Sequence, residues 1–133
     1  MLMIGELARA TGVATSALRY WEELGLLPVP VRVSGKRRYP ASAVDVVGEI
    51  LLLQDAGYTL KETRALRAGG DWREVAERKL AELDEHIARA QAARTAIVHG
   101  LACTHQDNRA CPNFAGLRKA RLAGVPLHEA HSH

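Results

Sequence analysis

Several features that would place the chain in other classes of protein are missing from its 133 residues. No apolar run approaches the roughly 18–20 residues that a membrane-spanning helix needs. Residues 1–6 form neither a basic segment nor a long apolar one, so we expect no signal peptide and a cytoplasmic location. There is no recognisable nucleophile–base pair and no phosphate-binding loop. The sequence therefore predicts a protein that is not an enzyme and has no membrane partner.

Cysteine is scarce, with Cys103 and Cys111 the only two in the chain. In the reducing cytoplasm, two cysteines are expected to be thiols or metal ligands rather than a standing disulfide. They are separated by seven residues in a polar stretch near the C-terminus. This pair is the first candidate for a chemically active site.

Acidic residues are absent between positions 24 and 44, although that stretch carries Arg32, Lys36, Arg37 and Arg38. The net charge of +3 and the pI near 9.1 are mild and suit a nucleic-acid partner without demanding one. With 47% hydrophobic and 25% charged residues, the chain has ordinary globular composition. Its length allows one compact domain and an extension.

The first 40 residues predict a helix-turn-helix followed by a small hairpin. A short helix ends at Gly12, and a second runs from about Thr15 to Glu23. Residues 26–40 contain two interior prolines, alternating valines and a Ser-Gly pair, which together predict a β-hairpin with a basic tip. Such a hairpin beside a helix-turn-helix is a wing.

Two more helices complete the domain predicted over residues 1–70. One is expected to start near Pro40, a favourable first helical residue, and to run to about Ala56. The other begins with a capping box formed by Thr59 and Glu62, and ends at the glycines 69–70.

A single long helix is predicted over residues 71–102, about 45 Å long at roughly 1.5 Å per residue. Positions that are apolar except for Arg94 follow alternating steps of four and three, which is the narrow seam of a coiled coil. The seam consists of Ala76, Leu80, Leu83, Ile87, Ala90, Arg94, Ile97 and Leu101. Because one helix cannot bury such a seam alone, we expect a homodimer. Folding of this helix back onto the N-terminal domain is the alternative.

The remaining residues divide into a loop with a short helix, over 103–124, and a flexible tail, over 125–133. Cys111 stands at an N-cap position before Pro112, and the short helix is expected to stop at Gly124. The histidines outside the loop are read as ordinary surface or tail residues. They are His86, His99, His128, His131 and His133.

Taken together, the motifs resemble the signature of the MerR family of bacterial transcription regulators over about residues 3–102. The similarity is carried by Ile-Gly-Glu-Leu-Ala at 4–8, Leu-Arg-Tyr-Trp-Glu-Glu-Leu-Gly-Leu-Leu-Pro at 18–28, Arg-Arg-Tyr at 37–39 and Ala-Gly-Tyr-Thr-Leu-Lys-Glu at 56–62. The resemblance implies a mainly α fold, in which two winged helix-turn-helix domains are joined by an antiparallel coiled coil. It also implies binding of double-stranded promoter DNA, and an effector that reshapes the promoter for RNA polymerase.

The residues expected to contact DNA lie on the second helix and on the wing. They are Thr15, Ser16, Arg19, Tyr20, Lys36, Arg37 and Arg38. Arg19 can make a bidentate contact with guanine or a phosphate contact, and the sequence does not decide between them. Of Tyr20 and Trp21, one is expected to pack inward and the other to flank the DNA backbone. Lys36 stands where the family commonly has tyrosine, which predicts a more salt-dependent wing contact.

The spacing of Cys103 and Cys111 resembles the copper-efflux-regulator branch of the family. Two soft thiolates suit Cu(I), Ag(I) or Au(I), and His105 as a further nitrogen donor would shift the preference toward Zn(II) or another divalent ion. Three other interpretations stay open. The thiols could sense oxidants or electrophiles, they could be purely structural, or the protein could be a non-specific architectural DNA-binding protein.

Overall fold

The structure is a computed structural model that describes residues 1–104 and 108–130. In these residues the chain is mainly helical, with one two-stranded antiparallel sheet, as the sequence predicts. No described helix is both long and apolar enough to cross a membrane. The chain forms two compact units, Met1–Lys79 and Leu80–His133, and each is described by itself.

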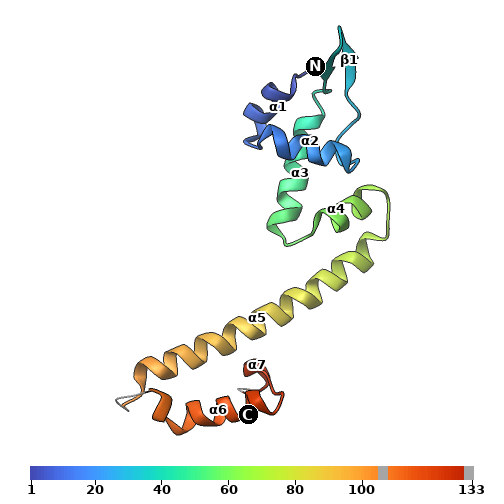
Figure 1. Ribbon diagram of the computed structural model, residues 1–133. Coiled ribbons are helices and arrows are strands. Elements are labelled where there is room, and N and C mark those ends of the chain that lie inside the picture. Colours follow the sequence, from blue (N-terminus) through green and yellow to red (C-terminus); the bar gives the residue numbers. More distant parts are fainter. Residues whose placement is uncertain (105–107, 131–133) are drawn as a thin grey trace. The chain divides into compact units, whose positions relative to one another are not determined.

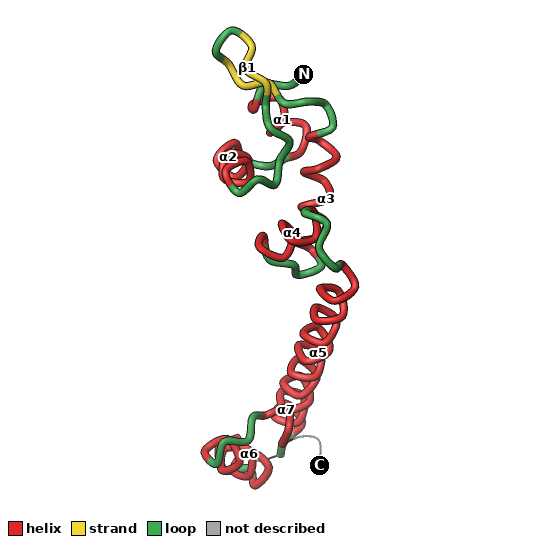
Figure 2. Tube along the Cα trace, turned by 90° about the vertical axis from the view of Figure 1, so that its right-hand side faces the viewer, coloured by secondary structure: helices red, strands yellow, loops and turns green. Residues whose placement is uncertain are grey.

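The first unit holds four short helices, a hairpin and the start of a long helix (Figures 1 and 2). Their bounds are α1 Ile4–Thr11, α2 Thr15–Glu23, β1 Val31–Val33, β2 Lys36–Arg38, α3 Ala43–Asp55, α4 Leu60–Arg67 and α5 Trp72–Ala102. The core lies where α1, α2 and α3 meet. It includes the fully buried Leu7, Leu18, Tyr39, Val47 and Ile50.

The hairpin has the geometry expected of a wing. Its strands pair antiparallel with Arg32 opposite Arg37, and the turn consists of Ser34 and Gly35. Both turn residues have positive φ, 53° and 78°, which is the pattern of a type I′ turn. At the base of the hairpin, Leu2 and Tyr39 exchange two backbone hydrogen bonds of 2.7 Å. The N-terminal residues thereby tie the wing to the core.

The predicted helix boundaries hold with one shift. Helix α3 begins at Ala43 rather than near Pro40, because residues 40–43 first form a turn in which the Ala43 N–H donates to the Pro40 carbonyl. The capping box of α4 is present. The Glu62 N–H donates to Thr59 Oγ1 at 3.1 Å, and the Thr59 N–H donates to Glu62 Oε1 at 2.9 Å.

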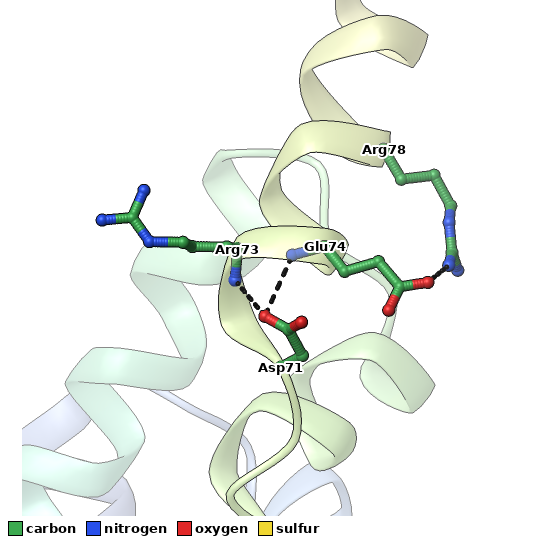
Figure 3. A network of polar contacts seen from close by, with 4 residues as sticks. All are labelled: Asp71, Arg73, Glu74 and Arg78. Atoms are coloured by element: carbon green, nitrogen blue, oxygen red, sulfur yellow. Dashed lines mark hydrogen bonds and ion pairs between the residues drawn. The ribbon is translucent and has the colours of Figure 1, made fainter.

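Helix α5 is capped by Asp71, as predicted (Figure 3). Asp71 Oδ1 accepts hydrogen bonds from the backbone N–H groups of Arg73 at 3.1 Å and Glu74 at 3.3 Å. One turn later, Glu74 forms an ion pair with Arg78 at 3.0 Å. These interactions satisfy free N–H groups in the first turn and set where the long helix begins.

A buried lysine attaches the start of α5 to α4. The Lys79 side chain is 9% exposed, and its Nζ forms an ion pair with Glu62 Oε1 at 3.0 Å. The same ammonium group lies 5.6 Å from the centre of the Tyr58 ring. Glu62 therefore caps α4 and anchors α5 at the same time, and these contacts together lower the pKa of its carboxyl group.

The second unit contains the rest of α5 and three short elements (Figure 1). These are the 3₁₀ helix η1 Asn108–Ala110 and the helices α6 Pro112–Leu122 and α7 Leu127–Ala130. Helix α6 begins as predicted, with Cys111 at its N-cap and Pro112 at its first position. The expectation of a flexible tail from residue 125 is wrong for its described part. Residues 127–130 form helix α7, which contacts α6.

Candidate nucleic-acid interface and metal centre

Helix α2 presents a polar outer face and an apolar inner one. Ser16, Arg19 and Tyr20 are exposed, whereas Leu18 and Trp21 are buried in the core. Trp21 is the residue of this pair that packs inward, and Tyr20 is exposed. Thr15 is half-buried at the start of the helix.

The wing carries its three basic side chains at different depths. Lys36 and Arg37 are exposed and Arg38 is half-buried, whereas Tyr39 is completely buried. Tyr39, which the sequence left between core and contact, is therefore a core residue. The candidate DNA surface accordingly consists of the outer face of α2 and the basic strand β2.

Glu22 connects these two parts of the surface. Its carboxylate accepts a hydrogen bond from the Tyr39 hydroxyl at 3.1 Å and forms an ion pair with Arg37 at 3.0 Å. Burial, and next the hydrogen bond to Glu22, raise the pKa of Tyr39, so its hydroxyl remains protonated and donates. Sequence patterns did not reveal this link. It means that Arg37 already has an acidic partner before any phosphate approaches.

Three potential metal ligands meet where α5 ends and α6 begins. Cys103 directly follows α5, Cys111 caps α6, and His99 lies one helical turn before Cys103. The ligand atoms of all three side chains lie within 4.8 Å of one another, and Cys111 Sγ is 3.6 Å from His99 Nε2. Both cysteines are thiols rather than a disulfide. His99 is exposed, Cys103 half-buried and Cys111 buried.

The surroundings of Cys111 favour its thiolate. The hydrogen bond with His99 makes the largest contribution in lowering the thiol pKa to about 6. Backbone N–H groups of Phe114 and Asn113, in the first turn of α6, and the Cys103 side chain lower it further, against the effect of burial. At neutral pH Cys111 is therefore mostly ionised, the form that binds metals and attacks electrophiles.

An apolar cavity of about 370 Å³ adjoins this cluster. Its lining comes from the last turns of α5 and the first turns of α6. The residues are Ala96, Ile97, His99, Gly100, Leu101, Cys103, Cys111, Asn113, Phe114 and Leu117. The thiols therefore lie at the edge of a hydrophobic hollow.

The sequence placed Cys103 and Cys111 in one site, and the structure brings them together. His105, the predicted additional donor, lies outside the described residues, as do His131 and His133. The interpretation of His99 as an ordinary surface residue is wrong, because its ring contacts Cys111. The spacing of His99 and Cys103 carried this signal, because residues i and i+4 of a helix lie on the same face.

Two sequence profiles of a known protein family together match most of the chain. A profile described as MerR HTH family regulatory protein matches residues 2–69, just over half of the chain. A second, described as MerR, DNA binding, matches residues 45–99. The chain belongs to the MerR family. It is a DNA-binding transcriptional regulator rather than an enzyme, and the interpretation as a non-specific architectural protein is not supported.

Several curated members of the MerR family resemble the chain over most of its length. The transcriptional regulator HmrR of Sinorhizobium medicae is 31% identical over 126 residues, covering 87% of this chain and 86% of the relative. Heavy metal-dependent transcription regulator 2 of Rhizobium meliloti is 29% identical over 119 residues, covering 82% and 81%. The regulator CueR of Escherichia coli O157:H7 is 28% identical over 124 residues, covering 86% and 92%.

Solved structures of MerR-family proteins share the fold of this regulator. A family member from Bacillus cereus aligns with a TM-score of 0.58 at 20% identity, covering 92% of this chain and 97% of the other. HiNmlR, described as a MerR-family regulator lacking the sensor domain and bound to promoter DNA, aligns with a TM-score of 0.52 at 20% identity, covering 92% and 94%. At these identities the similarity shows the fold alone.

Proposed function

We propose that this MerR-family regulator binds its promoter as a homodimer and responds to a thiophilic metal ion held by Cys103 and Cys111. The observation that carries the proposal is the meeting of the two sulfur atoms, within 4.8 Å, at the junction of α5 and α6. Two metal–sulfur bonds of about 2.3 Å span about 4.6 Å when they are collinear. A shared ion therefore requires little movement of the side chains.

The chemistry of the two side chains supports a soft ion. Cys111 is already mostly thiolate at neutral pH, and thiolates prefer Cu(I), Ag(I), Au(I) and Zn(II) to hard cations. Two thiolates alone favour a monovalent ion. A relative of similar length is named as heavy metal-dependent, which agrees with an ion as the effector.

The exposed seam of α5 supports the dimer. Leu80 is 60% exposed, Ile87 54%, Ile97 63% and Leu101 84%, in a strict coiled-coil spacing. Ala90 and Leu83 are exposed as well, and Ala76 is half-buried. Pairing with the same helix of a second copy buries this seam, which water otherwise covers at a cost of roughly 25 cal/mol per Å² of apolar surface.

DNA contact is assigned to the surface formed by α2 and β2. Ser16, Arg19 and Tyr20 face outward from the second helix of the helix-turn-helix, where recognition residues reach base edges. Thr15, Lys36, Arg37 and Arg38 flank that face and supply phosphate contacts.

Signal transmission is proposed to start at the junction of α5 and α6. An ion bridging Cys103 and Cys111 would fix the start of α6 against the end of α5, which is also the dimerisation helix. The ion shifts the regulator toward its activating state only if it binds that state more tightly. RNA polymerase would then use the reshaped promoter.

The test uses the full chain and a DNA site selected from a random-sequence pool. Wild type, Cys103→Ser and Cys111→Ser are each assayed for site affinity and for transcription by RNA polymerase, with Ag(I), Cu(I) and Zn(II) added separately. We expect all three proteins to bind the site alike, and the serine variants to lose activation by metal. A double serine variant that still responds to an ion would overturn the proposal, as would a wild type that responds to none.

A second candidate function is electrophile sensing, which the ionised Cys111 and the adjoining apolar cavity favour. A small apolar electrophile could enter the cavity, where the thiolate would add to an aldehyde carbonyl to give a hemithioacetal, or to the β-carbon of an enone to give a thioether, with water supplying the proton in each case. In that case, chelator-treated wild type would activate transcription on addition of an aldehyde or enone. Cys111→Ser would then lose the response, and Cys103→Ser would keep it.

A further inference from the structure

We propose that His99 is the third ligand of the site, and that this set of two sulfurs and one nitrogen selects a divalent ion of the zinc class. The proposal rests on the function proposed above, because it assumes that an ion binds the two thiols. It changes the expected effector, since the two sulfurs alone favour a linear monovalent ion.

The distance between His99 and Cys111 is the one that a shared ion requires. Zinc binds sulfur at about 2.3 Å and imidazole nitrogen at about 2.0–2.1 Å, so a tetrahedral angle between the bonds separates the two donors by about 3.6 Å. Cys111 Sγ and His99 Nε2 are 3.6 Å apart. These two donors are therefore already positioned for one ion.

The helix holds the third donor close to the other two. His99 belongs to the last turn of α5, and Cys103 follows that helix four residues later, on the same face. All three ligand atoms lie within 4.8 Å of one another. Three donors leave a fourth position for water or another donor, as in many zinc sites.

Charge favours a divalent ion. Two thiolates and a neutral imidazole carry a charge of −2, which a divalent ion cancels and a monovalent ion only halves. The site borders a cavity lined by Ile97, Leu101, Phe114 and Leu117, where a residual net charge is costly. The imidazole adds a bond without adding charge, which also suits ions of coordination number three or four.

The competing interpretation is that His99 only donates a hydrogen bond to the Cys111 thiolate. His99 would then stabilise the thiolate in the metal-free protein, and it would not coordinate an ion that the two sulfurs bind. Both interpretations predict an effect of His99 on thiol reactivity, so reactivity does not separate them. The number of nitrogen ligands around a bound ion does.

The experiment measures binding of Zn(II), Co(II) and Ag(I) to the full chain, in wild type, His99→Ala and the control His86→Ala. His86 is also an exposed histidine of α5, but it lies outside the cluster. Loss of an outer-shell partner alone costs about 10–100-fold in metal affinity, so loss of a direct ligand should cost at least tenfold. We expect that loss for Zn(II) and Co(II) in His99→Ala to exceed the loss for Ag(I), which comes only from the raised Cys111 pKa and disappears at a pH where the thiol is ionised in both proteins. The control His86→Ala should bind all three ions as wild type does.

X-ray absorption of the zinc-loaded protein identifies the ligands directly. We expect two sulfurs and an imidazole in wild type, the loss of the imidazole in His99→Ala, and zinc binding restored in His99→Cys, which supplies another soft donor. An imidazole that persists in His99→Ala and disappears in His105→Ala would overturn the proposal. So would a zinc affinity that His99→Ala leaves unchanged.

Failure of this inference and failure of the proposed function give different results. If Zn(II) binds wild type, is lost in Cys103→Ser and Cys111→Ser and keeps its affinity in His99→Ala, the metal-responsive function stands and His99 is not a ligand. If Ag(I) binds wild type and Zn(II) does not, the metal-responsive function stands and the selection of a divalent ion is wrong. If no ion binds wild type, the metal-responsive function itself is wrong.

Discussion

At the scale of single residues, the two cysteines differ because of what surrounds them. Cys111 is the N-cap residue of α6, so the backbone N–H groups of Asn113 and Phe114 help to lower its pKa, and His99 approaches it from α5. These interactions favour the negative charge of a thiolate and lower its pKa to about 6. Cys103 instead directly follows the C-terminal end of α5.

This difference predicts a pH dependence of alkylation. In metal-free protein, the rate at which iodoacetamide modifies Cys111 should rise through about pH 6 and level off above it, because only the thiolate reacts. His99→Ala removes the largest cause of the lowered pKa, so its midpoint should move upward, toward the usual value of about 8.5. Mass spectrometry of the Cys111 peptide follows the reaction. A wild-type midpoint already near that usual value would contradict the assignment.

At the scale of elements, α2 and the wing act as one surface because Glu22 joins them. Its carboxylate holds the Tyr39 hydroxyl and the Arg37 guanidinium, so the orientation of the wing depends on an acid in the last turn of α2. The Arg37 side chain is 42% exposed, and solvent screens an ion pair of this kind. Its effect is therefore mainly on where the guanidinium points and on how much of its charge is available to phosphate.

The two arginines of this surface should then respond differently to removal. Arg19→Ala should weaken binding to the selected site by roughly 1–3 kcal/mol if its guanidinium reads a base edge, with a smaller effect on random DNA. Arg37→Ala should weaken binding to both DNAs alike and make the salt dependence shallower by less than one unit, because Glu22 already neutralises part of its charge. Binding titrations over a range of salt concentrations measure both. Equal losses on specific and random DNA in Arg19→Ala would make it a phosphate contact.

At the scale of the whole molecule, α5 is the element whose apolar seam is exposed in a single chain. Its first turns are held by Asp71 and by the buried Lys79, yet every residue from 80 to 91 is exposed. A helix of this kind is stable when a second helix covers its apolar seam.

Replacing Leu83 and Ile87 together with aspartate should give monomers that no longer bind the selected site. Two charges on the seam of each chain cannot be buried without partners, whereas Ala81→Asp with Ala88→Asp puts the same charges on exposed positions outside the seam. Sedimentation equilibrium of both double variants measures the mass in solution. A dimer that persists in the seam variant would show that the two chains associate elsewhere.

Most of the fold could be predicted because its signals are local. These signals involve residues within about four positions of one another, so they do not depend on tertiary contacts. They are the helix caps at Thr59 and Asp71, the Ser-Gly turn of the wing and the seam of α5. The start of α3 was misplaced by a few residues because a proline suits a turn as well as a first helical position.

The sequence by itself determined the helices, the wing, the family and the two thiols of the site. Only the tertiary structure decided which groups meet across loops. The approach of Cys111, at the start of α6, to the end of α5 brings it to His99, and packing of the wing brings Arg37 to Glu22. Contact with α6 accompanies helix α7 in the described part of the predicted tail. Such pairings depend on how the elements pack against one another, and the sequence periodicity within one element does not predict that packing.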